Sequence, residues 1–290
     1  MRPLPEFRLH RPEALSGALE LLDALADCKP IAGGTDLLLF LRDGTIRARH
    51  LVDVTGIEEM RGISLEDGEI WIGAATPLSE VASSELVAEL APALAEAVSQ
   101  IGSAQTRNQG TIGGNICNAS PAADSAPPLL VLDARLDVSS KAGGKTIPVS
   151  ELFAGPKLNS LGRGELVTAI RIPEPPEGSG ASFQKLGRRR GSTLSVVNAA
   201  AYVELNGGRC SAARLALGAI ATTPIRVAPA EGLLVEREPT EAVVEAAASA
   251  CRECVSPVDD IRGSAGYRRD MSAVLMRRAI KGALRRAGVA

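Results

Sequence analysis

Histidine and aromatic residues are scarce in this 290-residue sequence, which has two histidines, one tryptophan, two tyrosines and four phenylalanines. His10 and His50 alone cannot supply a histidine-rich metal site, and no serine–histidine–acid triad is apparent around either of them. We therefore expect neither metal binding nor histidine-dependent hydrolysis. With 2% aromatic residues, the core has to be built mainly from Leu, Val, Ile and Ala.

Cysteine is also infrequent, and its count of five is odd. An odd number of cysteines without an apparent leader argues against a disulfide framework. Cys251 and Cys254 have CxxC spacing inside a predicted helix, but no second CxxC or histidine pair accompanies them. We favour a partly buried helical pair over a metal or redox site.

Long apolar runs are absent, since no stretch approaches the roughly 20 residues that a membrane span requires. The first fifteen residues, MRPLPEFRLHRPEAL, lack the apolar core of a signal peptide. The 32 basic and 34 acidic residues give a net charge of −2, which argues against a nucleic-acid partner. We expect a soluble, cytoplasmic protein.

The N-terminal pattern predicts a βαβ unit with parallel strands. A helix is expected over 14–25, and strands over 29–34 and 50–56 flank a helix over 36–44. Further on, a strand is expected over 69–75. Thr76 and Pro77 are expected to open a helix to about residue 90, with another helix over 91–102.

A long polar stretch, 103–128, is predicted to be a functional loop. Strands are expected over 129–140, 145–149 and 165–173, and residues 174–180 (EPPEGSG) are the best linker candidate. Beyond the linker, strands over 194–205 and 210–220 flank a turn at Asn206-Gly207-Gly208. Two helices follow, one from about residue 240 and one over 266–286.

The first glycine loop, Ala32-Gly33-Gly34-Thr35-Asp36-Leu37, lies between a predicted strand and a predicted helix. Glycines there permit positive φ, so that consecutive backbone N–H groups point at an anion. The helix N-terminus adds partial positive charge, and Thr35 adds a hydroxyl donor. Asp36 is expected to cap the helix.

The second loop, Thr111-Ile112-Gly113-Gly114-Asn115, offers the same chemistry. Two such loops suit the pyrophosphate of a dinucleotide, although a Gly-Gly pair is more often a tight turn. Neither loop is a GxGxxG fingerprint. The segment 143–146 (GGKT) resembles the end of a P-loop, but Ser139 replaces the first glycine. We interpret this segment as a hairpin turn, which disfavours ATP or GTP hydrolysis.

The motifs AGGTDLL and TRNQGTIGGNICNASPAAD, in this order and separation, resemble the FAD-binding medium subunits of molybdenum hydroxylases. That family includes the carbon monoxide dehydrogenase medium subunit and the flavin domain of xanthine dehydrogenase. The resemblance covers nearly the whole chain and implies an α+β fold. It implies an FAD-binding domain of the VAO/MurB-like (PCMH) type over 1–174, with subdomains of about 1–55 and 56–174. A C-terminal domain over 175–290 would combine a small antiparallel sheet with helices.

The resemblance also implies which residues contact FAD. They are Pro30, Ile31, Ala32, Gly33, Gly34, Thr35, Asp36 and Leu37 in the first loop, Thr111, Ile112, Gly113, Gly114 and Asn115 in the second, and Ile101, Asp124, Val167 and Lys185 elsewhere. Phe183 is the only aromatic residue near Lys185, which leaves stacking on the flavin open. The extra cysteine-rich loop of the 4-hydroxybenzoyl-CoA reductase medium subunit is missing, so no metal is expected.

The function implied is that of an electron-transfer subunit of an oxidoreductase, without catalytic residues of its own. Electrons would come from a molybdenum-cofactor large subunit through 2Fe–2S clusters on a small subunit, and leave to NAD, a quinone or oxygen. A dimer of heterotrimers is expected. Two alternatives stay open: a free-standing flavin oxidoreductase of the UDP-N-acetylenolpyruvylglucosamine reductase type, and a docking subunit without cofactor. Arg188, Arg189 and Arg190 form either a solvated face or a docking site for a partner subunit.

Overall fold

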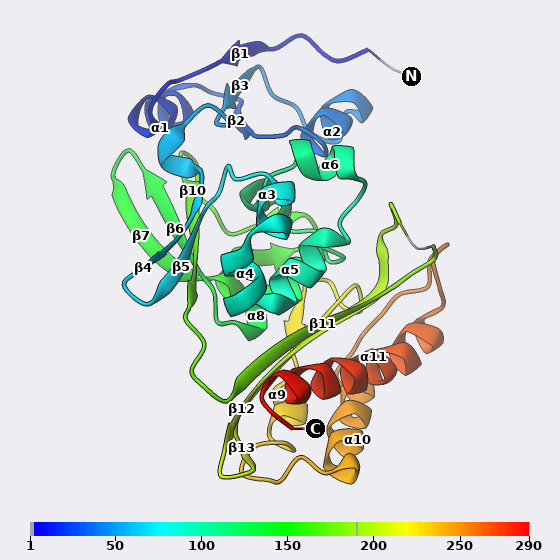
Figure 1. Cartoon of the computed structure of the whole chain (residues 1–290). Coiled ribbons are helices and arrows are strands. Elements are labelled where there is room, and N and C mark those ends of the chain that lie inside the picture. Colours follow the sequence, from blue (N-terminus) through cyan, green and yellow to red (C-terminus); the bar gives the residue numbers. More distant parts are fainter. Residues whose placement is uncertain (1–2, 190, 290) are drawn as a thin grey trace.

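The N-terminal segment folds into a small parallel sheet, as its strand–helix–strand pattern predicts. In the computed structural model, which describes residues 3–189 and 191–289, this sheet lies at one end of the molecule (Figure 1). Its strand order is β1–β3–β2, and both pairings are parallel. The elements are β1 (Arg8–His10), α1 (Leu15–Ala24), β2 (Cys28–Ile31), α2 (Leu37–Asp43) and β3 (His50–Asp53).

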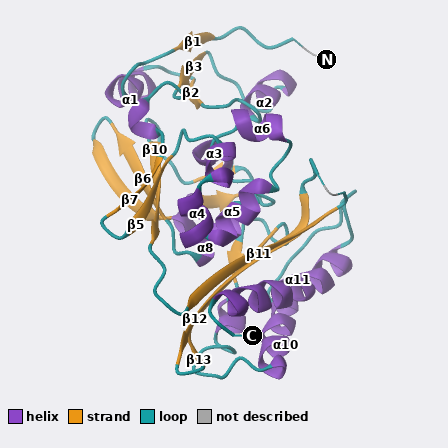
Figure 2. Ribbon diagram, in the orientation of Figure 1, coloured by secondary structure: helices purple, strands orange, loops and turns teal. Residues whose placement is uncertain are grey.

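A five-stranded antiparallel sheet of order β4–β5–β10–β6–β7 forms the second layer. Its strands are β4 (Ile63–Glu66), β5 (Glu69–Gly73), β6 (Arg135–Ser140), β7 (Gly143–Pro148) and β10 (Leu166–Pro173). Helices α3 (Leu78–Ser83), α4 (Glu85–Leu90), α5 (Pro92–Ser99) and α8 (Ala126–Val131) stand beside it (Figure 2). Aliphatic side chains of the sheet, such as Ile72 and Ile170, join those of α5 and α8 in one buried core.

Several predicted boundaries in this region are wrong. The helix expected to start at Thr76 is two helices, because Ser84 caps a second one by accepting from the Val87 amide. Thr76 instead exchanges hydrogen bonds with the backbone of Gly62. The 143–146 segment lies inside strand β7, and the turn that precedes it consists of Lys141 and Ala142.

The stretch 103–128, predicted as a loop, contains two short helices and the first half of a third. These are α6 (Ala104–Gln109), α7 (Ile112–Cys117) and α8, which also replaces the start of the strand expected over 129–140. Ser103 and Thr111 are N-caps, and each accepts a hydrogen bond from the third residue that follows. These caps are the sequence signal that the prediction overlooked.

The C-terminal sheet is antiparallel, with order β11–β12–β13–β14. It comprises β11 (Ser179–Gly187), β12 (Ser195–Asn206), β13 (Arg209–Gly218) and β14 (Ile225–Arg226). The predicted turn is confirmed, since Gly207 and Gly208 join β12 to β13 and both have positive φ. The division of the chain at residues 174 and 175 stays a prediction about where one folding unit ends.

This sheet is covered on both faces, and the strand period decides which residue faces which way. Along β12, Ala200 and Tyr202 join the core that contains α5 and α8, whereas Val197, Ala201 and Val203 join a second core. The second core is closed by α9 (Ala228–Glu231), α10 (Glu241–Ala250) and α11 (Ala265–Arg286), which are visible below the sheet in Figure 1.

Cys251 ends the predicted CxxC helix early, because α10 stops at Ala250 and a 3-10 turn, η3 (Cys251–Glu253), follows. Its thiol contacts the Ala247 carbonyl, and burial raises the pKa of Cys251 to about 12. A thiol with that pKa stays protonated near neutral pH and is a poor metal ligand or nucleophile. The remaining elements are η1 (Glu58–Met60), η2 (Val149–Leu152), β8 (Phe153–Gly155) and β9 (Leu158–Asn159).

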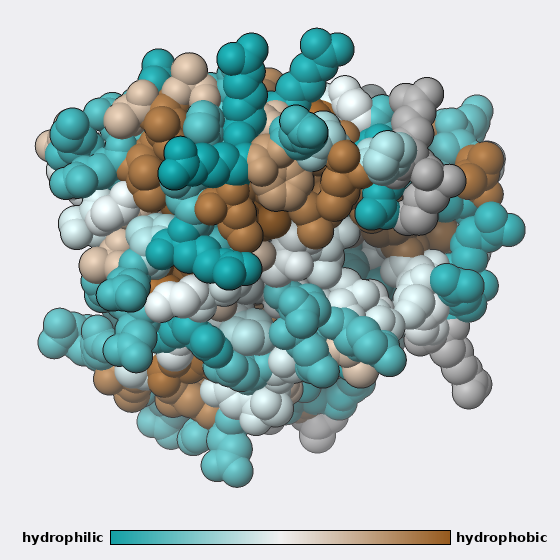
Figure 3. Space-filling view, turned by 90° about the horizontal axis from the view of Figure 1, so that it is seen from above, coloured by the Kyte–Doolittle hydropathy of each residue, from teal (hydrophilic) through white to brown (hydrophobic). Residues whose placement is uncertain are grey.

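Within residues 3–189 and 191–289, no helix is long and apolar enough to span a membrane, and no three or more His, Cys, Asp or Glu side chains are grouped so that they could hold a metal ion. On the face that carries the N-terminal sheet, apolar side chains gather in a band among charged ones (Figure 3). Leu4, Leu9 and Leu39, which belong to this end of the chain, are among the exposed large apolar residues.

Asp260 organises the loop before α11. Burial by itself raises the pKa of this carboxyl group, but hydrogen bonds from Arg262 and Arg268 outweigh it and hold the pKa well below its usual range. The ionised Asp260 therefore stabilises the folded protein at pH values above the pKa of the unfolded carboxyl group, about 3.9. This stabilisation is lost as the pH falls toward the lower pKa that the carboxyl group has in the folded protein.

We expect Asp260→Asn to cost about 2 kcal/mol of unfolding free energy at neutral pH, because hydrogen bonds between ionised groups are the strong ones. Denaturant unfolding of both proteins across the acid range checks this. The difference between them should narrow as the pH falls below about 4. A pH-independent difference would show that the charge of Asp260 contributes nothing.

Candidate functional site

The two glycine loops meet in space, although about eighty residues separate them in sequence. A Cβ atom on Gly33 would lie 1.7 Å from the carbonyl oxygen of Gln109, just before the second loop. Asp36 of the first loop accepts a hydrogen bond of 3.1 Å from Asn118 Nδ2, at the end of α7. In Figure 1, α2 and α6 accordingly lie next to each other. The loops therefore form one continuous wall.

The first loop presents unused backbone donors. Gly34 has a φ of +69°, the left-handed conformation that its glycine permits. Within the part of the chain that the structure describes, no acceptor is recorded for the amides of residues 33–36 or for the Thr35 hydroxyl. Such a run of free N–H groups is what an anion requires.

Asp36 does not cap α2 as predicted. It occupies the N-cap position, but its backbone is helical and its side chain makes no capping hydrogen bond. The carboxylate is instead engaged by Asn118, which ties the first loop to the second. This arrangement directs the negative charge of Asp36 to a fixed donor.

The second loop has a different role from the one its sequence suggests. The amides of Ile112 and Gly113 donate to Thr76 and Ala74, the amide of Gly114 donates to Thr111 Oγ1, and that of Asn115 donates to the Thr111 carbonyl. The predicted array of free N–H groups is therefore wrong for this loop. Its exposed residue is Gly114, whose missing side chain leaves the surface open toward Ala32, 3.9 Å from a Cβ built there.

A buried polar network extends from the second loop. Asn115 Oδ1 accepts from Ser125 Oγ at 2.7 Å, and Asp124 precedes Ser125 in the chain. Asp124 Oδ2 is 2.6 Å from Lys185 Nζ, and both side chains are about 95% buried. Asp124 Oδ1 accepts from Ser195 Oγ at 2.5 Å and from Asn198 Nδ2 at 2.7 Å. The structure thus brings the predicted residues Asn115, Asp124 and Lys185 together.

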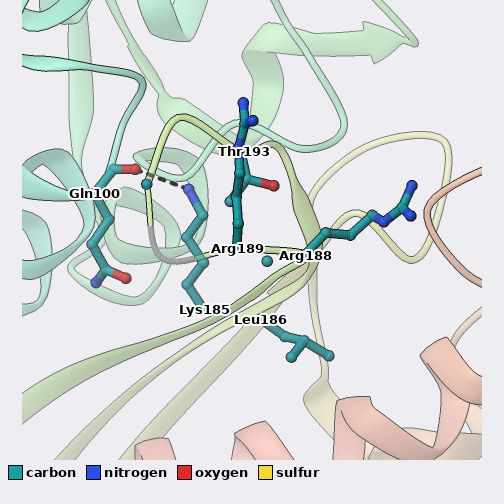
Figure 4. Close-up of a pocket in the computed structure, with 8 residues that line it drawn as sticks. Gln100, Lys185, Leu186, Arg188, Arg189 and Thr193 are labelled. Atoms are coloured by element: carbon teal, nitrogen blue, oxygen red, sulfur yellow. Dashed lines mark hydrogen bonds between the residues drawn. The ribbon is translucent and has the colours of Figure 1, made fainter.

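Lys185 lies on β11 at the edge of a hollow of about 420 Å³. Figure 4 shows its side chain directed toward Gln100, whose carbonyl oxygen accepts a 3.0 Å hydrogen bond from Lys185 Nζ. Leu186, the next residue, points the other way and packs on the second core. The hollow is lined by Gln100, Lys185, Leu186, Gly187, Arg188, Arg189, Gly191 and Thr193.

The other predicted contacts lie around these groups. Pro30 and Ile31 end strand β2, Ala32 leads into the first loop, and Leu37 begins α2. Ile101 is partly buried, and its carbonyl accepts from Arg107. Val167 is buried in β10, which contacts α7.

Phe183 is buried in the main core, with its amide bonded to Glu96, so it presents no open ring face for stacking. The Arg188 side chain donates to the Ile261 carbonyl, and the Arg189 side chain donates to the Ser192 carbonyl. Arg190 lies outside the described residues.

Several residues of the site escaped sequence reasoning. Gln109, Asn118, Ser195 and Asn198 were not singled out, because ordinary polar residues carry no motif of their own. Ser195 and Asn198 are nevertheless completely buried. Polar residues within the apolar run LSVVNAAAYVEL are the only sequence signal that points to them.

Comparison with known proteins shows which family this chain belongs to. Residues 5–175 match the model of the FAD-binding domain in molybdopterin dehydrogenases, and residues 181–283 match that of the C-terminal domain of the CO dehydrogenase flavoprotein. The chain is 35% identical to the xanthine dehydrogenase FAD-binding subunit of Escherichia coli O157:H7 over 281 residues, which cover 96% of each protein. It is 33% identical to the carbon monoxide dehydrogenase medium chain of Afipia carboxidovorans, covering 97% of this chain and 98% of that one.

Among solved structures, a chain of carbon monoxide dehydrogenase from Hydrogenophaga pseudoflava superimposes with a TM-score of 0.94 at 33% identity, covering 98% of this chain and 99% of that one. The α+β fold and the resemblance seen in the glycine motifs are thereby confirmed. The chain belongs to the family of FAD-binding medium subunits of xanthine and carbon monoxide dehydrogenases, and is the flavoprotein component of an oxidoreductase.

Proposed function

We propose that this chain holds FAD where its two glycine loops meet, and that it passes electrons from 2Fe–2S clusters on a partner subunit to an external acceptor. One observation supports the proposal: the two glycine loops are in contact, and the first loop has backbone N–H groups that are free to bind a ligand. Gly33 packs against Gln109, and the amides of residues 33–36, beside the exposed Gly114, have no acceptor among the residues that the structure describes. A diphosphate needs several donors on an open surface, and this wall supplies them.

The first loop, Pro30 to Leu37, would bind the pyrophosphate through its amides and the Thr35 hydroxyl. The second loop would contribute Gly114 as a surface without a side chain, and the Asn115 amide group, whose Oδ1 is already engaged by Ser125. Thr111, Ile112 and Gly113 would shape that loop rather than donate to the ligand. Ile101 and Val167 would contribute apolar surface.

The hollow beside Lys185 is the place we propose for the flavin ring. Its volume of about 420 Å³ falls within the usual range of ligand pockets, roughly 300–1,000 Å³. When bound there, FAD supplies the electron-carrying chemistry, which amino-acid side chains lack. Lys185 keeps a fixed cation at this edge, and Asp124 and the Gln100 carbonyl hold it in place.

The assembly we propose follows from the relatives, whose names describe subunits of xanthine and carbon monoxide dehydrogenases. A large subunit with molybdenum cofactor would oxidise the substrate, and a small subunit would carry the 2Fe–2S clusters. NAD or a quinone would accept the electrons from a cytoplasmic dimer of heterotrimers. The apolar band on the face that carries the N-terminal sheet (Figure 3) is surface of the kind that partner subunits cover.

The absorption spectrum of the purified chain, incubated with FAD and desalted, tests the cofactor site. We expect flavin bands in the wild type and their loss in Gly114→Asp, because a carboxylate there would face the loop proposed for the pyrophosphate. Flavin retention should fall by at least about tenfold, the equivalent of 1.4 kcal/mol.

Gly266→Asp is the control for exposure and helix position, since Gly266 is also an exposed glycine in the first turn of a helix. An added Cβ has no atom within 4 Å at Gly266, whereas at Gly114 it would lie 3.0 Å from Thr111 Oγ1. Equal loss of flavin in both variants would contradict the placement of the site. Substrate turnover by the isolated chain would favour a free-standing reductase. A chain that takes up no FAD, even when co-purified with its partner subunits, would favour a docking subunit.

A further inference from the structure

Ser195 and Asn198 stand at the start of β12, in the C-terminal sheet, and not in either glycine loop. Both are completely buried, and both donate to the same oxygen, Oδ1 of Asp124. The other oxygen of Asp124 is left to Lys185. Each carboxylate oxygen of Asp124 thus faces its own set of donors.

The segment 119–125, which contains Asp124, is attached on two sides. On the side of the C-terminal sheet, the amide of Ala219 donates to the Pro121 carbonyl at 2.7 Å. On the side of the glycine loops, Ser125 donates to Asn115, and the amide of Lys157 donates to the Ala119 carbonyl at 2.9 Å. The segment therefore connects the C-terminal sheet to the second glycine loop by hydrogen bonds.

Asn198 is costly for a residue with only a packing role. Its Oδ1 atom is buried and has no hydrogen-bond partner among the described residues. An unsatisfied buried acceptor destabilises the folded state, and an apolar side chain of similar size would avoid this cost. Gly218, its register partner on β13, leaves it room, since a Cβ there would lie 2.2 Å from Asn198 Oδ1. The hydrogen bond from Asn198 Nδ2 to Asp124 offsets the cost of burying Oδ1 without a partner.

We propose that Ser195 and Asn198 are positioning residues of the flavin site, which act through Asp124 on the Lys185 ammonium group. By occupying Oδ1, they fix the rotation of the carboxylate and draw its negative charge toward β12. Lys185 then keeps positive charge at the edge of the hollow. A cation there favours the reduced, more electron-rich flavin. This inference rests on the proposed placement of FAD.

The test uses Ser195→Ala, Asn198→Leu and the double variant in the full chain loaded with FAD. Redox titration measures the flavin potential, and denaturant unfolding measures stability. Without the two donors, both oxygens of Asp124 can turn toward Lys185 and neutralise it. We expect affinity for reduced FAD to fall about tenfold relative to oxidised FAD in the double variant, a decrease of about 30 mV for a two-electron couple. Single variants should show smaller decreases.

Ser211→Ala is the control, because Ser211 is an exposed serine of β13 whose hydroxyl group donates to the Glu204 carbonyl, away from Asp124 and Lys185. It should leave the potential unchanged. If the double variant does not fold, the flavin potential of Ser195→Ala still tests the inference, because this variant lacks only one hydroxyl group. Lower stability with an unchanged potential would show a purely structural role and overturn the inference. A wild-type chain that binds no FAD, alone or in its complex, would overturn the proposed function itself.

Discussion

Gly33→Ala is expected to separate the two glycine loops and to weaken FAD binding by about 100-fold. The new Cβ atom would lie 1.7 Å from the carbonyl oxygen of Gln109 and 2.8 Å from the amide nitrogen of Gly110. Both atoms belong to the backbone, so the clash cannot be relieved by rotating a side chain. Inserting a methyl group into a packed contact of this kind costs about 3 kcal/mol.

Two measurements check this prediction: the free energy of unfolding without FAD, and the dissociation constant of FAD. If the free-energy cost of the inserted methyl group destabilises only the conformation that binds FAD, the affinity for FAD should decrease by about 100-fold. Gly56→Ala is the control, since Gly56 has no atom within 4 Å of an added Cβ and should tolerate the change. Normal FAD affinity in Gly33→Ala would mean that loop contact is not required for the site.

Asp124→Ala is expected to be among the most destabilising single substitutions in the chain. It would leave the ammonium group of Lys185 buried without its carboxylate, and would deprive Ser195 and Asn198 of their common acceptor. Removing one partner of a buried ion pair costs about 3–5 kcal/mol. We therefore expect a loss of about 4 kcal/mol in unfolding free energy.

Lys185→Met should cost less, because Asp124 would keep its two donors on β12. The double variant should lose less stability than the sum of the single losses, since the pair interacts directly. Denaturant unfolding of the wild type and the three variants forms a complete cycle. Strictly additive losses would show that the 2.6 Å contact contributes no coupling. Lys185→Met should also lower the flavin potential, and an unchanged potential would remove its proposed electronic role.

In the C-terminal half of the chain, the hairpin turn and the start of α10 were predictable because local signals there agree with the tertiary structure, whereas strand β11 (Ser179–Gly187) was not predicted. Gly207 and Gly208 supply the positive φ angles of the hairpin turn, and Thr240 caps α10 through the amide of Val243. In the stretch 103–128, glycine and polar residues concealed short helices. Helices of six residues have weak intrinsic stability and form here because Ile112 and Ile116 are buried in the main core.

By itself, the sequence determined the residue types available to the site: two Gly-Gly loops, a threonine in each, and a family resemblance that points to FAD. It also determined the parallel N-terminal unit, because strand and helix periodicities are local properties of the chain. Which backbone donors remain free was decided only by the tertiary structure. The amides of the second loop donate to Ala74, Thr76 and Thr111, whereas those of residues 33–36 have no acceptor within residues 3–189 and 191–289.

Tertiary structure also decided the partners of Asp124. These partners lie between 61 and 74 residues further along the chain, in the C-terminal sheet: Lys185, Ser195 and Asn198. No local pattern specifies such contacts, because they depend on how the C-terminal sheet packs against α5 and α8. Because Asp124 and Lys185 are buried, these contacts contribute strongly to stability, since a charged group removed from water needs hydrogen-bond partners within the protein.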